Sequence, residues 1–227
     1  MLASAAYTEP ELRAREKYFE SKASPGTTID IFPPEKFPIN THLPPTQEEL
    51  AKASLGIVSS AKKAEKKGYD AAIVYNSYDP GLAAAMSTVK MPVVGAGRAA
   101  LSTALMLADK LSIIAPYTAF IPMTCRAISA AGLTPKITPT IYALDIPIDT
   151  IRNRKEETRK KFVNLAKKGI ADGGQIIVPL GLNSLSVHLP MDKLGLGCPV
   201  IDAVSISIRY AEMLVNLGLS QSKLAYS

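Results

Sequence analysis

The sequence predicts an α/β fold made of two pseudo-symmetric lobes with mostly parallel sheets. Short apolar runs alternate with helical segments along most of the chain, and this alternation is typical of parallel strands covered by helices. The length of 227 residues fits one large domain or two small lobes. A repeat with a spacing of 107 residues, described below, favours the second arrangement.

The first helix is expected to begin after Thr8, because Thr8 and Glu11 form a capping box. This helix is expected to end near Pro25. The chain is therefore expected to open directly on a helix. Residues 27–32 form a short run rich in β-branched residues, and the prolines that follow, up to Pro45, exclude regular structure.

A second capping box, Thr46 with Glu49, predicts a helix up to about residue 67, followed by an apolar strand over 70–77. Strands are then expected over 92–95, 111–115, 136–144, 175–180 and 199–202, and helices over 80–88, 98–109, 119–131, 150–168, 185–194 and 203–217. We assign residues 1–96 plus 203–227 to the first lobe and 97–202 to the second.

The repeat joins two loops that follow apolar strands. Asn76 and Ser77 recur 107 residues later as Asn183 and Ser184, and the run Pro-Val-Val at 92–94 recurs as Pro-Val-Ile at 199–201. Open α/β sheets bind ligands at the carboxyl ends of their strands. The repeat therefore predicts that the two Asn-Ser loops face each other across a ligand cleft between the lobes.

Composition excludes several classes of function. The net charge of +6 comes from lysines on helical polar faces without interleaved aromatic residues, so we expect no nucleic acid partner. The two cysteines, Cys125 and Cys198, are too few for a disulfide scaffold and are not clustered as a metal site. Prolines interrupt the longest uncharged stretches, and the start lacks a basic region before an apolar core. We therefore expect a cytoplasmic protein with no membrane partner.

Three stretches carry a family resemblance: GYDAAIVYNSYDPGLAAA at 68–85, MPVVGAGRAALSTALMLADKLSIIAP at 91–116 and LGCPVIDAVSISIRYAEMLVNLGLS at 196–220. With ALDIP at 143–147, the chain resembles the aspartate, glutamate and hydantoin racemase superfamily, and most of all its hydantoin racemase branch. The resemblance implies two lobes around a small carboxylate or hydantoin-like ligand, and an isomerase that uses no cofactor and no metal. We also expect a homo-oligomer.

The chain departs from the family at its most important positions. Racemases of this superfamily use two cysteines as acid and base on opposite faces of the substrate carbon, and these cysteines fall on Asn76 and on Leu182 or Asn183. A carboxamide donates hydrogen bonds but does not abstract a proton, so the two-thiol mechanism is expected to fail here. Cys125 and Cys198 are interpreted as packing residues. By the resemblance, the family's first strand is also expected to be missing from the start of the chain, which would remove one edge of the first lobe.

The candidate site combines residue chemistry with the resemblance. The candidate catalytic residues are Asn76, Ser77, Asp79 and Asn183. The candidate substrate-binding residues are Asn40, Thr41, Tyr78, Pro80, Gly81, Arg98, Tyr117, Thr118, Leu182 and Ser184. Backbone amides at the helix start near Thr118 would favour an anion, and Arg98 at another helix start requires an anionic partner unless it faces solvent.

These residues favour an enzyme that acts at a carbon adjacent to a carbonyl, as an isomerase or as a lyase variant such as a decarboxylase. Two alternatives stay open: a binding protein that kept the pocket without catalysis, and a hydrolase that uses Ser77 or His188. For Asp79, which precedes a proline at a predicted helix start, the role of helix cap is favoured over the catalytic role. The run Gly-Ala-Gly at 95–97 lacks the third glycine of a dinucleotide site, so that interpretation is rejected.

Overall fold

The computed structural model describes residues 1–34, 38–39 and 43–226, without the side chains of 148 and 149. Contacts within the chain divide it into two compact units. Unit 1 comprises the described residues of Met1–Thr41, Pro45–Ala99 and Val204–Ser227, and unit 2 those of His42–Pro44 and Ala100–Ala203.

The sheet of unit 1 contains three parallel strands in the order β1 (Leu2–Ala3), β2 (Ala72–Tyr75) and β3 (Val93–Gly95). The expectation that the chain opens on a helix is wrong, because β1 precedes the first helix and pairs Leu2 with Val74. The expected strand over 27–32 is reduced to a single bridge between Phe32 and Leu2. This bridge extends the sheet beyond β1.

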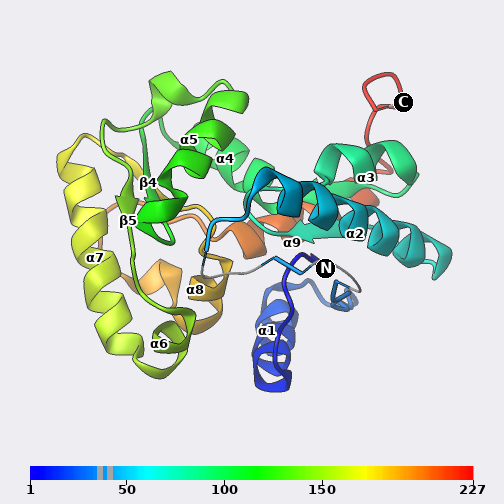
Figure 1. Cartoon of the computed structure of the whole chain (residues 1–227), viewed down its shortest axis with the longest axis horizontal. Helices are drawn as coiled ribbons and strands as arrows, with labels where there is room; N and C mark the ends of the chain where they lie inside the picture. Colours follow the sequence, from blue (N-terminus) through cyan, green and yellow to red (C-terminus); the bar gives the residue numbers. More distant parts are fainter. Residues whose placement is uncertain (35–37, 40–42, 227) are drawn as a thin grey trace. The chain divides into compact units, whose positions relative to one another are not determined.

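Helices cover both faces of this sheet, as the fully buried strand β2 requires. Residues Ala72 and Val74 pack toward α2 (Gln47–Lys66) and α3 (Leu82–Thr88), which contact each other (Figure 1). Residues Ile73 and Tyr75 point to the other face and pack with side chains from α1 (Glu9–Lys22) and α9 (Ala203–Asn216). The two-residue alternation of a strand thus divides the core into two layers.

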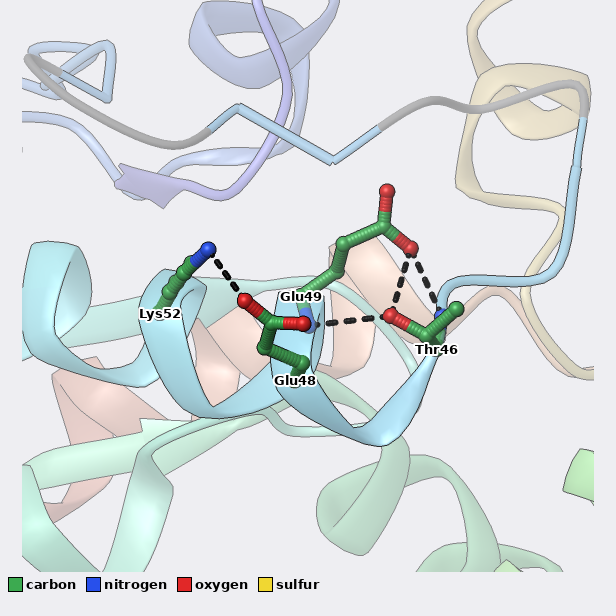
Figure 2. Close-up of polar contacts among 4 residues, drawn as sticks. All are labelled: Thr46, Glu48, Glu49 and Lys52. Atoms are coloured by element: carbon green, nitrogen blue, oxygen red, sulfur yellow. Dashed lines mark hydrogen bonds and ion pairs between the residues drawn. The ribbon is translucent and has the colours of Figure 1, made fainter.

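Both capping boxes are present. At the start of α2, the Thr46 hydroxyl accepts from the Glu49 amide at 3.2 Å, and the Glu49 carboxylate accepts from the Thr46 amide at 2.7 Å (Figure 2). In the same helix, Lys52 forms an ion pair with Glu48, with 2.5 Å between Nζ and Oε1 (Figure 2). At α1 the Glu11 carboxylate accepts from the Thr8 amide at 2.8 Å. The local sequence signal therefore fixed both helix starts.

The sheet of unit 2 is also parallel, in the order β5 (Tyr142–Ala143), β4 (Leu111–Ala115) and β6 (Ile176–Pro179). The expected strand over 136–144 is mostly irregular, and that over 199–202 is a single bridge between Val200 and Ile177. Side chains from β4 and β6 share a core cluster with Phe162 and Ala166.

The helical segments of unit 2 follow the expected order with different bounds. The expected helix over 150–168 is two helices, which separate at Arg154 because its backbone, at φ −127° and ψ 61°, is not helical. The segments are η1 (Thr118–Phe120), α5 (Ile121–Ala130), η2 (Thr134–Lys136), α6 (Ile148–Asn153), α7 (Lys155–Ala171), α8 (Asn183–His188) and η3 (Met191–Lys193), after α4 (Ala96–Leu107), which begins in unit 1.

The two units share one chain topology. In unit 1, the first strand β1 lies between the bridge at Phe32, which comes second along the chain, and β2, which comes third. In unit 2, the first strand β4 lies in the same way between β5, which comes second, and β6, which comes third. A fourth segment, β3 or Val200, lies beyond the third. The predicted α/β fold with parallel sheets and pseudo-symmetric lobes is confirmed at this level. Among the described residues, no helix is both long and apolar enough to span a membrane.

Candidate functional site

The candidate site of unit 1 lies where β1, β2 and β3 end, because parallel strands end at the same edge of a sheet. Asn76 directly follows β2, and its side chain bonds to the segment after β1 and to the turn that follows β2. Its Nδ2 donates to the Ser4 hydroxyl at 2.9 Å, and its Oδ1 accepts from the Tyr78 amide at 2.9 Å. Asn76 therefore links the end of β1 to the turn after β2.

Asp79 completes this turn in an unusual conformation. Its φ of 49° lies in the left-handed region, and its carboxylate accepts from the amides of Gly97 at 3.0 Å and Arg98 at 2.7 Å. Asp79 therefore caps α4, which follows the neighbouring strand β3, whereas α3 begins after Gly81. Burial raises the pKa of Asp79 to about 6, although the two amides and the Arg98 charge favour the ionised form.

The glycines at 95 and 97 allow this close contact. A Cβ on Gly97 would collide with the carbonyl oxygen of Ser77, and one on Gly95 would meet the Asp79 carboxyl group. Gly81 has a φ of 70°, and a Cβ there would lie 2.8 Å from the Ser54 Cα. The Gly-Ala-Gly run thus lets the loop after β2 pack on the start of α4. Ser77 and Pro80 are buried and Tyr78 is half-buried in the same loop.

The side chain of Arg98 is exposed and bonds to the end of the chain. Its Nη1 donates to the Tyr226 hydroxyl at 2.9 Å and lies 3.8 Å from the Met86 sulfur. The anion expected at this helix start is the protein's own Asp79 carboxylate.

In unit 2, Thr118 follows β4 and bonds to Asp145, which follows β5. The Asp145 carboxylate accepts from the Thr118 amide at 2.7 Å and from its hydroxyl at 2.8 Å. Asp145 also has a left-handed backbone, with φ 46°. Asp145 was not among the site residues predicted from the sequence, and the signal that could have found it was its position in the family-like run ALDIP. Tyr117, next to Thr118, packs against Phe120 with the two rings tilted by 39° and their centroids 6.0 Å apart.

The second Asn-Ser pair begins α8 after β6. Leu182 precedes the helix and is buried in the core cluster of unit 2, whereas Asn183 and Ser184 are half-buried in the first turn. His188 is the last residue of α8 and is half-buried. Because β4 pairs with β6, the start of α8 and Thr118 lie at the same edge of this sheet.

Two candidates, Asn40 and Thr41, lie outside the described residues. The packing interpretation of the cysteines holds for Cys198, which contacts the core cluster of unit 2 and whose thiol pKa is raised by burial. It is wrong for Cys125, which is exposed on α5. Neither thiol directly follows the carboxyl end of a named strand.

A cavity of about 820 Å³ in unit 1 lies at the opposite, amino-terminal end of its sheet, where Met1 and Ala71 line it with Glu212 of α9. None of the candidate site residues lines it. Within the described parts of the chain, no group of three or more His, Cys, Asp or Glu side chains is arranged to hold a metal ion.

Residues 3–211 match the family model of the Asp/Glu/hydantoin racemases. The chain belongs to this family. It is 29% identical over 171 residues to a hydantoin racemase from Rhizobium meliloti, covering 74% of this chain and 69% of that protein. The superfamily and hydantoin branch predicted from the sequence are thereby confirmed.

Two solved structures of allantoin racemases show the same fold. Allantoin racemase from Klebsiella pneumoniae is 25% identical with a TM-score of 0.82, covering 100% of this chain and 91% of that one. Allantoin racemase from Pseudomonas fluorescens is 23% identical with a TM-score of 0.84, covering 99% and 94%. The general racemase-like character of the chain is therefore supported by both sequence and fold.

Proposed function

We propose that this protein is a racemase-type enzyme that exchanges the proton on a carbon adjacent to a carbonyl, in a small cyclic imide or carboxylate. The observation that carries the proposal is the Asp79 carboxyl group, whose pKa is raised to about 6 at the carboxyl edge of the unit 1 sheet. A general base works best when its pKa lies near the working pH. Asp79 is thus suited to accept a proton, which Asn76 is not.

The neighbouring polar groups would hold the substrate. A carboxamide carries two N–H donors, and that of Asn76 uses one of them on Ser4. We assign the second donor to the substrate carbonyl, where charge develops as the proton leaves. By the family resemblance, Asn183 and Ser184 at the start of α8 are also assigned to substrate binding.

A second candidate is a non-catalytic binding protein. Each oxygen of Asp79 accepts a backbone amide of α4, which is a structural role. By the family resemblance, the family's two cysteines fall on Asn76 and on Leu182 or Asn183, which have no thiol. This arrangement would retain ligand binding without proton transfer.

Proton exchange in heavy water separates the two candidates. We expect NMR to show deuterium entering the α-carbon of a 5-substituted hydantoin or a small amino acid faster than in buffer alone. Asp79→Asn should lower this rate at least tenfold, whereas Asp109→Asn, at a side chain 91% exposed, should not. Loss of a substrate carboxyl group in the same spectra would indicate a lyase.

If calorimetry detects ligand binding while deuterium exchange stays at the rate in buffer alone, the result would support a non-catalytic binding protein. Absence of both binding and exchange, across hydantoins and carboxylates, would overturn the proposal.

A further inference from the structure

The bonds between Thr118 and Asp145 determine what Thr118 can offer a ligand. Its amide donates to one carboxylate oxygen at 2.7 Å and its hydroxyl donates to the other at 2.8 Å. A carboxylate has only acceptor atoms, so the single hydroxyl proton of Thr118 is directed to Asp145. The Thr118 hydroxyl oxygen can still accept a hydrogen bond from a ligand.

Asp145 is held in place by its surroundings. Its amide donates to the Pro116 carbonyl at 2.8 Å, and its own carbonyl accepts from the Lys161 ammonium at 3.1 Å. The neighbours Leu144 and Ile146 are buried. A left-handed aspartate is uncommon and persists where surrounding contacts fix it.

The carboxylate also changes the electrostatics of this edge. The start of a helical segment ordinarily attracts an anion through its free amides. Here the Thr118 amide is bound to an anion of the protein itself. A substrate carboxylate at this position would meet a like charge and a hydroxyl that has no proton to donate.

We propose that Asp145 is a specificity-determining residue, which makes Thr118 a hydrogen-bond acceptor and so selects the N–H of a neutral ring over a carboxylate. This inference rests on the proposed function and on the family resemblance, by which Thr118 is a candidate substrate-binding residue. Asp145 itself acts through Thr118 and is a positioning residue.

The decisive variant is Asp145→Asn, because asparagine tolerates the left-handed backbone. The Thr118 amide cannot reverse its direction, so the Asn oxygen would stay against it. The Asn NH₂ would then face the Thr118 hydroxyl, whose proton becomes free to point to the ligand. Selectivity should therefore reverse.

We would measure dissociation constants by calorimetry for a 5-substituted hydantoin, its N1-methyl and N3-methyl analogues, and the corresponding open-chain carboxylate. In the wild type, one of the two methyl groups should weaken binding about tenfold, as expected for loss of one hydrogen bond. In Asp145→Asn, the parent hydantoin should bind about tenfold more weakly, that methyl group should have little effect, and the carboxylate should bind more tightly.

Two controls separate selectivity from structural damage. Asp172→Asn makes the same change opposite the Tyr142 hydroxyl, 2.8 Å away in the same unit, and should leave all ratios unchanged. Thr118→Ser keeps the hydroxyl and should keep the wild-type preference, whereas Thr118→Val should weaken the hydantoin without improving the carboxylate.

An Asp145→Asn protein that is folded and binds every ligand as the wild type does would overturn this inference alone. Equal weakening of all ligands would overturn it too, because it would indicate a purely structural cap. A wild type that binds none of the ligands would overturn both this inference and the proposed function.

Discussion

Two aspartates, Asp79 and Asp145, have left-handed backbones, and no other non-glycine residue in the described part of the chain does. Asp79 follows β2 and caps the helix after β3, and Asp145 follows β5 and caps the segment after β4. Each conformation costs on the order of 1 kcal/mol, which two hydrogen bonds from amides or hydroxyls to a carboxylate offset. Each unit thus places an internal anion at one helical start.

The raised pKa of Asp79 predicts a specific dependence of stability on pH. Folding raises this pKa from 3.8 to about 6, so the folded protein binds the proton more tightly. The contribution is complete below about pH 4 and is lost as pH rises through 6, by an amount on the order of 3 kcal/mol. Urea denaturation at pH 4 and pH 7, compared between wild type and Asp79→Asn, measures it.

The expected result is that the wild type loses stability relative to Asp79→Asn between these two pH values. Taking the difference between the two proteins removes the contributions of other carboxyl groups. A difference that stays constant from pH 4 to 7 would show that burial does not raise this pKa.

Gly97 allows a second residue-level prediction. Gly97→Ala should destabilise the protein by about 3 kcal/mol or more, because the new Cβ meets the Ser77 backbone, which cannot move without disturbing the turn. Gly132→Ala is the control, since no atom lies within 4 Å of its Cβ and only its φ of 70° opposes alanine. Its cost should be about 1 kcal/mol. Equal costs in urea denaturation would contradict the steric argument.

Residues that act locally were predictable and those that act across the chain were not. Thr46 and Glu49 are three residues apart, so their capping box could be recognised from spacing alone. Asp145 and Thr118 are 27 residues apart, and their bond exists only because β4 and β5 are paired. The left-handed backbone of Asp145 is also imposed by tertiary contacts.

At the scale of elements, apolar runs predicted the order of the sheet segments better than the length of each strand. Val200 lies in an apolar run as expected, yet it forms one bridge, because a strand needs a continuous row of partners. The two residues of β1 were missed because their run is short and their pairing partners, Val74 and Tyr75, are more than 70 residues away in the sequence. The break at Arg154 left no proline or glycine signal in the sequence.

The segment after α9 bonds through Gln221 to the first residue of β3 and to the chain that precedes this strand. The Gln221 side chain accepts from the Val93 amide at 3.2 Å and donates to the carbonyls of Val89 at 2.9 Å and Met91 at 3.0 Å. An amide with both functions replaces part of a missing strand.

Gln221→Ala should therefore destabilise the protein by about 1–3 kcal/mol, because it leaves partly buried backbone groups without their partner. Leu224→Ala in the same segment, at a side chain 99% exposed, should change stability by less than about 0.5 kcal/mol. Thermal unfolding of both variants checks this. A Gln221→Ala protein as stable as the wild type would show that water replaces these bonds.

At the scale of the whole molecule, the 107-residue repeat corresponds to the shared topology of the two units. Val93 in β3 and Val200 in the outer segment of unit 2 hold equivalent places, beyond β2 and β6 respectively. The repeat could be recognised from sequence because the same strand order imposes similar apolar runs and turns. It could not show which loop residues bond to one another within each unit.

This repeat leads to a prediction about restoring thiols. By the family resemblance, the two cysteines of a racemase fall on Asn76 and on Leu182 or Asn183. The structure favours Asn183, because Leu182 is 4% exposed and packs in the core of unit 2, so a thiol there would be buried in that core. Asn76→Cys removes bonds to Ser4 and Tyr78 and should cost about 1–2 kcal/mol of stability.

We expect the double variant Asn76→Cys, Asn183→Cys to racemise an enantiopure 5-substituted hydantoin at least tenfold faster than the wild type, as followed by polarimetry, because inversion needs an acid and a base on opposite faces of the carbon. Each single variant, with one thiol, should exchange the proton without a comparable gain in inversion. The pair Asn76→Cys, Leu182→Cys serves as the matched control and should stay inactive. A folded double variant that gives no racemisation would contradict the alignment of both loops with the family's catalytic positions.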